Sequence, residues 1–100
     1  MTDEQTISWI FLAIALASQK EAANFSGISI IADGINHAVP TQKEMQKSIL
    51  YLRTNDLVRK QSKKYDLTTK AKLYTRLIAS DHSKTLLEVW KKLEESIEVK

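Results

Sequence analysis

Ten of the fifteen basic side chains of this 100-residue chain lie between residues 41 and 78, where only three acidic side chains accompany them. That segment carries a net charge of +7, whereas residues 1–40 carry −3 and residues 79–100 carry −1. Such a concentration of cations suggests a polyanionic partner. The alternative is a solvated lysine-rich surface, and the charge alone does not separate the two interpretations.

Little else in the sequence suggests chemistry at a site. The chain has no cysteine, which excludes disulfides, thiolate-bound zinc, iron–sulfur clusters and cysteine nucleophiles. No Ser/His/Asp spacing, carboxylate pair, glycine-rich loop or paired-histidine motif accompanies its two histidines, His37 and His82. Asp33 and His37 are four residues apart and could share a metal or a proton, although a hydrogen bond or no contact is the simpler interpretation. We therefore expect no enzyme activity, no metal and no cofactor.

Length and composition predict one globular domain over residues 1–100, with its core in residues 2–78. Two glycines and one proline are too few for a turn-rich β protein, so we expect a mainly helical chain. The apolar run Trp9–Ala17 covers nine residues, whereas a membrane span needs about 20. Acidic Asp3 and Glu4 precede this run, unlike the basic start of a signal peptide. These features predict a soluble cytoplasmic protein with no membrane partner.

Apolar periodicity and capping residues predict three helices in the first half of the chain. The first covers about residues 2–20 and is apolar around most of its circumference, which predicts packing partners on more than one side. The second covers about residues 28–38, with Ser26 as its candidate N-cap. The third begins at the capping box Thr41-Gln42-Lys43-Glu44 and runs to about Asn55.

The periodicity then changes to partial alternation, which predicts a small β-hairpin. Its strands are Leu57–Gln61 and Lys64–Leu67. Thr68 is the candidate cap of a fourth helix, which ends at the polar segment 80–83. A last helix over residues 83–98 has apolar residues at spacings of four, three and four, as in a helix that pairs with another helix.

Two segments resemble the sequences that open and close the hairpin of bacterial winged-helix regulators. Thr54-Asn55-Asp56-Leu57-Val58-Arg59-Lys60 is similar to the pattern of a helix end, Asn-Gly-Leu-Ile/Val and basic residues. Tyr65-Asp66-Leu67-Thr68-Thr69-Lys70-Ala71 is similar to Tyr-x-Leu-Thr-x-x-Gly. Both patterns occur in the PadR and MarR families, and the small size with a trailing helix is more similar to PadR. The resemblance implies a winged helix-turn-helix fold, mainly α with a β-hairpin wing, of about five helices including a C-terminal dimerisation helix.

The same resemblance implies sequence-specific binding of double-stranded DNA by a dimeric transcriptional regulator. Amide and ammonium groups at the start of the third helix could bond base edges, and basic residues of the hairpin could contact phosphates. Two alternatives are a winged helix that binds another protein without DNA, favoured by Leu50 and Tyr51, and a binder of DNA ends or structured RNA. The expected DNA contacts are Thr41, Gln42, Lys43, Gln46, Lys47, Arg53, Arg59, Lys60, Ser62, Lys63 and Lys64.

The last helix has two possible partners. It could fold back on the first helix of its own chain, or it could cross to a second subunit, as the resemblance implies. We expect the homodimer, because two-fold symmetry lets a DNA-binding protein contact two half-sites. A small-molecule effector, for which the sequence gives no signal, would have to lie between helices or at the dimer interface. The expected dimer contacts are Trp9, Phe11, Leu86, Trp90, Leu93 and Ile97.

Overall fold

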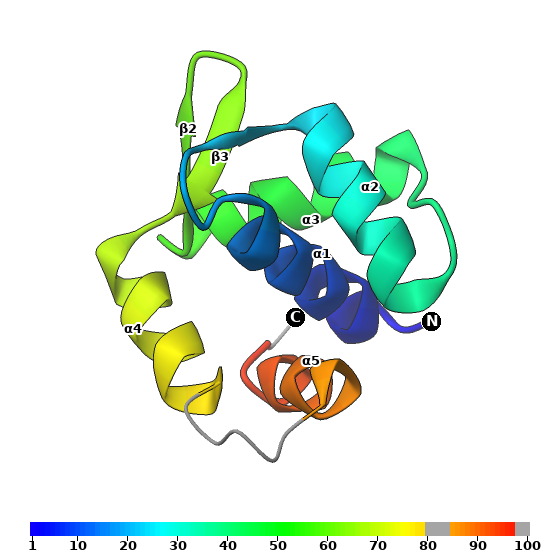
Figure 1. Cartoon of the computed structure of the whole chain (residues 1–100). Helices are drawn as coiled ribbons and strands as arrows, with labels where there is room; N and C mark the ends of the chain where they lie inside the picture. The colour runs from blue at the N-terminus through cyan, green and yellow to red at the C-terminus, as the bar shows by residue number, and fades with distance from the viewer. Residues whose placement is uncertain (80–84, 98–100) are drawn as a thin grey trace.

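The computed structural model describes residues 1–79 and 85–97, apart from the side chains of Ile78 and Ala79. This part of the chain holds five helices and one three-stranded antiparallel sheet, which confirms a mainly helical fold with a small hairpin (Figure 1). The predicted break at residues 80–83 lies outside the described residues. The last helix is shorter than the predicted 83–98, because Thr85 caps its start and Ser96 follows its last residue, Glu95. The elements are α1 (Asp3–Ala17), β1 (Ala23–Asn24), α2 (Phe25–Asn36), α3 (Gln42–Thr54), β2 (Val58–Gln61), β3 (Lys64–Leu67), α4 (Thr69–Ala79) and α5 (Leu86–Glu95).

Helix α1 lies in the middle of the molecule and contacts α2, α3 and α5 (Figure 1). Every residue from Ile7 to Ile14 is buried, so the helix has no solvent-facing side over these two turns. This packing explains its apolar circumference and confirms that it needs partners on more than one side.

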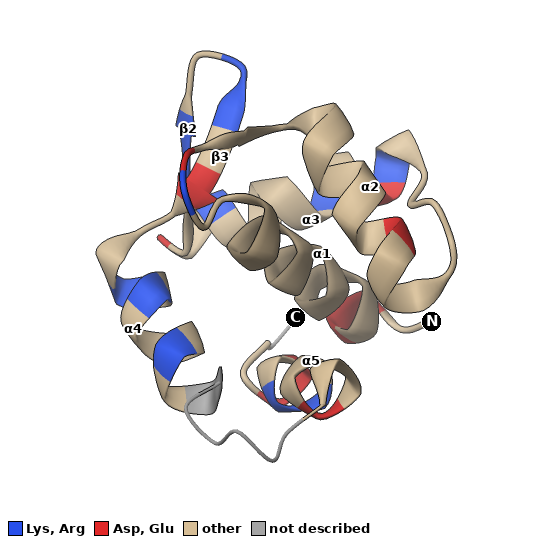
Figure 2. Cartoon of the chain, viewed as in Figure 1, with Lys and Arg blue, Asp and Glu red and all other residues tan. Residues whose placement is uncertain are grey.

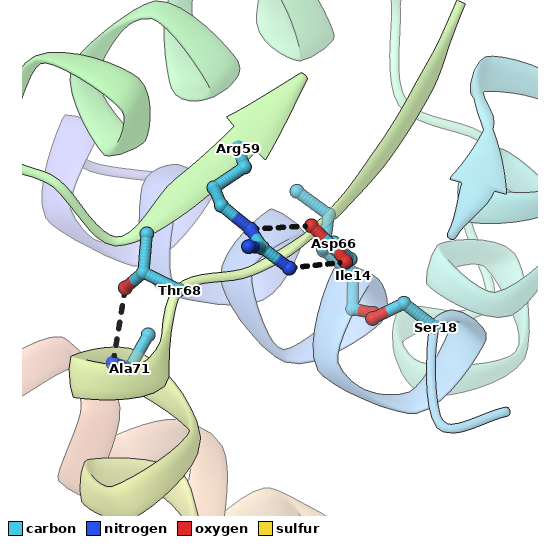
Figure 3. Close-up of polar contacts among 6 residues, drawn as sticks. All are labelled: Ile14, Ser18, Arg59, Asp66, Thr68 and Ala71. Atoms are coloured by element: carbon cyan, nitrogen blue, oxygen red, sulfur yellow. Dashed lines mark hydrogen bonds and ion pairs between the residues drawn. The ribbon is translucent and has the colours of Figure 1, made fainter. Parts of the chain in front are cut away.

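Local capping residues set where three of the helices begin. Thr2 and Thr41 each accept a hydrogen bond from the backbone N–H three residues later, and Gln5 and Glu44 complete the two capping boxes. Thr68 Oγ1 accepts a hydrogen bond of 3.2 Å from Ala71 N–H at the start of α4 (Figure 3). The predicted caps Thr41 and Thr68 are therefore confirmed, and Thr2 caps α1.

The start of α2 differs from the prediction. Asn24 Oδ1 accepts a hydrogen bond of 2.8 Å from Gly27 N–H, so Asn24 is the N-cap and Ser26 is already helical. The physical reason is that asparagine caps a helix at least as well as serine, and it comes first along the chain. Asn24 also ends β1, a two-residue strand that the sequence analysis did not predict.

The sheet has the strand order β1-β3-β2. Strands β2 and β3 form the predicted hairpin, with Val58 opposite Leu67 and Gln61 opposite Lys64. The turn between them is Ser62-Lys63, in which Ser62 has a left-handed φ of 58°. Val58, Tyr65 and Leu67 are buried, so the hairpin is anchored to the core through alternate residues.

The connection from α3 to the hairpin is a Schellman motif. Leu57 N–H donates a hydrogen bond of 2.8 Å to Leu52 O, and Asp56 N–H donates one of 3.1 Å to Arg53 O. Asp56 has a left-handed φ of 59° at the position that glycine occupies in the Asn-Gly-Leu pattern. This motif determines the direction in which the chain leaves α3 and enters β2.

Helix α5 folds back on α1 of the same chain. The rings of Trp9 and Trp90 lie 6.3 Å apart, and Trp90 Nε1–H donates to Gln5 O and Ser8 Oγ. The expected dimer contact was therefore wrong for Trp9, Phe11, Leu93 and Ile97, which are buried in the core of one chain. The apolar seam of α5, which is its side that faces the core, packs against α1, so these four side chains are not available to a second copy. Trp90 is half-buried against α1, and Leu86 is exposed.

Candidate nucleic-acid interface

The outer face of α3 is formed by the side chains that point away from the core. Met45, Ser48, Ile49 and Leu52 are buried against the rest of the molecule. With a period of 3.6 residues, the opposite side of the helix must therefore face solvent. All six long side chains on that side are exposed: Gln42, Lys43, Gln46, Lys47, Leu50 and Arg53. The outer face of α3 is defined by these six residues.

The second group of predicted contacts lies on the β2–β3 hairpin. Arg59, Lys60, Ser62, Lys63 and Lys64 are all exposed. Strand β2 contacts α3, so the stem of the hairpin adjoins the helix that precedes it. Figure 2 shows lysine and arginine on α3, the hairpin and α4, whereas α2 carries an acidic residue and no basic one.

Arg59 is held within the hairpin by Asp66, the residue directly opposite it on β3. Its Nε and an Nη donate hydrogen bonds of 3.1 and 2.9 Å to the two carboxylate oxygens (Figure 3). These hydrogen bonds, and then the charge of Asp66, raise the pKa of Arg59 above its ordinary value. Arg59 therefore stabilises the pairing of the strands, and much of its charge is neutralised locally.

Two further cations of the predicted site have partners in the chain. Lys47 Nζ lies 2.9 Å from a carboxylate oxygen of Asp3 at the start of α1. Lys60 Nζ lies 5.8 Å from the centre of the Tyr65 ring, in a cation–π contact. Both ammonium groups lie at the surface, where such contacts are weak, so a phosphate could compete for them.

Four cations remain for an external partner: Lys43, Arg53, Lys63 and Lys64. Each is exposed and has no hydrogen-bond or ion-pair partner within residues 1–79 and 85–97. Lys43 and Arg53 are ten residues apart on α3, which is about 15 Å along the helix axis. Thr41 is also exposed, but its hydroxyl serves as the cap of α3.

Helix α4 carries further cations that are not among the predicted contacts. Lys70, Lys72 and Arg76 are exposed, and no acidic residue belongs to this helix. The charge count of residues 41–78 already contained this signal, because it included these three residues.

Apolar side chains are exposed next to the start of α3. Ile30 and Val39 are 69% and 68% exposed, and they border a cleft of about 580 Å³ between α2 and α3. Phe25 and Met45 line the cleft, and Asp33 is its one charged residue. This cleft is suited to an apolar partner and not to a phosphate.

Other kinds of site find no support in the described part of the chain. No three histidine, aspartate or glutamate side chains of residues 1–79 and 85–97 lie close enough together to hold a metal ion. In the same residues, no helix is long and apolar enough to cross a membrane. None of the family models, curated proteins and solved structures compared with this chain matches it.

Proposed function

We propose that this chain is a winged-helix protein that binds double-stranded DNA sequence-specifically, as a dimeric transcriptional regulator. In this proposal α3 lies in the major groove, and the β2–β3 hairpin is the wing that contacts the DNA backbone. The observation that carries the proposal is the exposed polar and cationic outer face of α3, followed directly by a hairpin with four exposed basic residues.

The side chains of the outer face of α3 have the chemistry that base recognition needs. Gln42 and Gln46 can each form two hydrogen bonds to adenine, and Lys43 can donate to guanine. Arg53, Lys63 and Lys64 supply positive charge for phosphates, which position a protein on the duplex without reading its sequence. The Schellman motif after α3 supports this division of roles, because it holds the hairpin in a fixed direction relative to the helix.

Salt dependence tests the proposal. On a random-sequence duplex, where Lys43 has no specific guanine to contact, each of the four unpartnered cations can neutralise one phosphate, so log Kd should rise with log salt concentration with a slope of about 3.6. Affinity for a random-sequence duplex should then fall about 100-fold between 50 and 200 mM salt. A flat response would contradict the proposal.

A pair of matched variants tests where the DNA binds. Lys43→Glu with Lys63→Glu should abolish measurable binding to the duplex at 150 mM salt, because it reverses two of the four free charges. Lys91→Glu with Lys92→Glu changes the net charge equally on α5, which packs against α1. The α5 variant should retain most of the affinity. An equal loss in both variants would show non-specific attraction instead of the proposed interface.

The second candidate is a winged helix that binds another protein. The cleft between α2 and α3 favours it, since Ile30 and Val39 expose apolar surface beside a single carboxylate. Ile30→Asp separates the two functions. It should leave duplex affinity unchanged if DNA is the partner, and it should abolish the interaction if a protein docks in the cleft.

Dimerisation is proposed through surfaces other than the buried seam of α5. Leu86 is 48% exposed, and Leu73 and Leu77 of α4 and Leu87 of α5 also expose much of their side chains. These leucines provide apolar area that a second copy could cover. Sedimentation of the full chain tests this part of the proposal independently of DNA.

A further inference from the structure

We propose that Leu50 recognises a thymine methyl group and thereby sets part of the sequence specificity of this protein. The inference rests on the proposed DNA-binding function. Its starting point is a large aliphatic side chain, 65% exposed, in the otherwise polar outer face of α3.

The neighbours of Leu50 place it within that face. Helical residues three and four apart lie side by side, so Leu50 is surrounded by Gln46, Lys47, Arg53 and Thr54. All four are polar and exposed. Leu50 lies one turn beyond Gln46 on the same face, so a helix that lays Gln46 against a base edge brings Leu50 close to the next bases of the groove.

The chemistry of the major groove leaves one base that matches this side chain. Guanine, cytosine and adenine present hydrogen-bond donors and acceptors there, and leucine would remove water from those groups without replacing its hydrogen bonds. Thymine alone among the four bases presents an apolar group, its C5 methyl. Contact between Leu50 and that methyl group buries apolar surface on both sides.

Replacing thymine with deoxyuridine removes the methyl group and leaves base pairing intact. Burial of one methyl group corresponds to about a fourfold change in affinity. The preferred duplex is first selected from a random-sequence pool with the full chain. Each thymine of that duplex is then replaced singly by deoxyuridine, and Kd is measured by fluorescence anisotropy.

At one thymine position, the wild-type protein should lose about fourfold in affinity on removal of the methyl group. Leu50→Ala should bind the thymine and deoxyuridine duplexes equally. Ile30→Ala is the matched control, because Ile30 is 69% exposed on α2, away from the outer face of α3, and it should keep the wild-type ratio. Leu50→Gln should change the preferred base at that position from thymine to adenine, since glutamine pairs with adenine through two hydrogen bonds.

The same experiment separates failure of this inference from failure of the proposed function. Sequence-specific binding with no thymine-to-deoxyuridine difference, or with an equal difference in Leu50→Ala, would overturn the role of Leu50 and leave DNA binding intact. A pool that yields no preferred duplex and no salt-dependent binding would overturn both.

Discussion

Replacing Asp56, the left-handed residue of the Schellman motif, tests how α3 is joined to the hairpin. Asp56 has a φ of 59°, and its backbone N–H and carbonyl bond Arg53 and Thr68. Its carboxylate makes no hydrogen bond or ion pair within the described residues. Substitutions at this position therefore change conformational preference and charge without removing a side-chain contact.

Three effects set the expected magnitude for Asp56→Gly. The left-handed conformation costs an ordinary L residue about 1–2 kcal/mol, and aspartate lies toward the low end because it tolerates this region. Glycine removes this cost, but its greater freedom in the unfolded chain offsets about 0.5–1 kcal/mol of the resulting gain in stability. Removing a negative charge from a helix C-terminus further raises the free energy of unfolding, by about 0.3–1 kcal/mol. The sum predicts that Asp56→Gly raises the free energy of unfolding by about 1 kcal/mol, which is about 4–8 °C in Tm for a domain of this size.

Chemical and thermal unfolding followed by circular dichroism measures this change. Asp56→Asn should gain only the charge effect, because asparagine tolerates the left-handed region as aspartate does. Asp56→Ala should be less stable than Asp56→Asn, since alanine loses that tolerance. A glycine variant less stable than wild type, or an alanine variant as stable as the glycine variant, would refute the assignment of Asp56 to a left-handed cap.

Three further predictions concern the core, the charge of the interface and self-association. Ser48 Oγ is buried without a hydrogen-bond partner in the described part of the chain, so Ser48→Ala should raise the free energy of unfolding by about 1 kcal/mol in a urea titration; a loss of stability would contradict it. Asp3→Asn frees Lys47 from its ion pair and should tighten duplex binding about twofold to fivefold at 50 mM salt, whereas Glu4→Gln, an equal charge change one residue away, should have less effect. Leu86→Glu should lower the mass measured by sedimentation if the exposed leucines of α4 and α5 join two copies, and an unchanged dimer would exclude them.

The parts of the fold that sequence predicted are those governed by residues close together in the chain. The capping box of Thr41 depends on a residue three positions later, so its signal is local. The strands of the hairpin were placed to within one residue, because a two-residue turn leaves little choice of register. Strand β1 was missed because two residues, Ala23 and Asn24, are too few to show alternation.

In the candidate site, too, local patterns could be predicted from the sequence and contacts between distant residues could not. The helical periodicity of residues 41–55 is a local pattern, and the contacts expected on α3, among them Lys43 and Gln46, are all exposed. The partner of Lys47 was not predictable, because Asp3 lies 44 residues away and no pattern connects the two. Periodicity likewise showed that α5 has an apolar seam without showing which helix covers it, and this is why Leu93 was assigned to a second subunit.

The central claim is that α3 and the hairpin form one surface that binds a DNA duplex. Amide chemical shifts of the ¹⁵N-labelled full chain, recorded as duplex is added, test it most directly. We predict that the shifts concentrate in residues 41–54 and 59–64 and move together at the same duplex concentration, while those of α5 stay in place. Shifts confined to α4, α5 or the cleft beside Ile30, or no shifts at low salt, would contradict the claim.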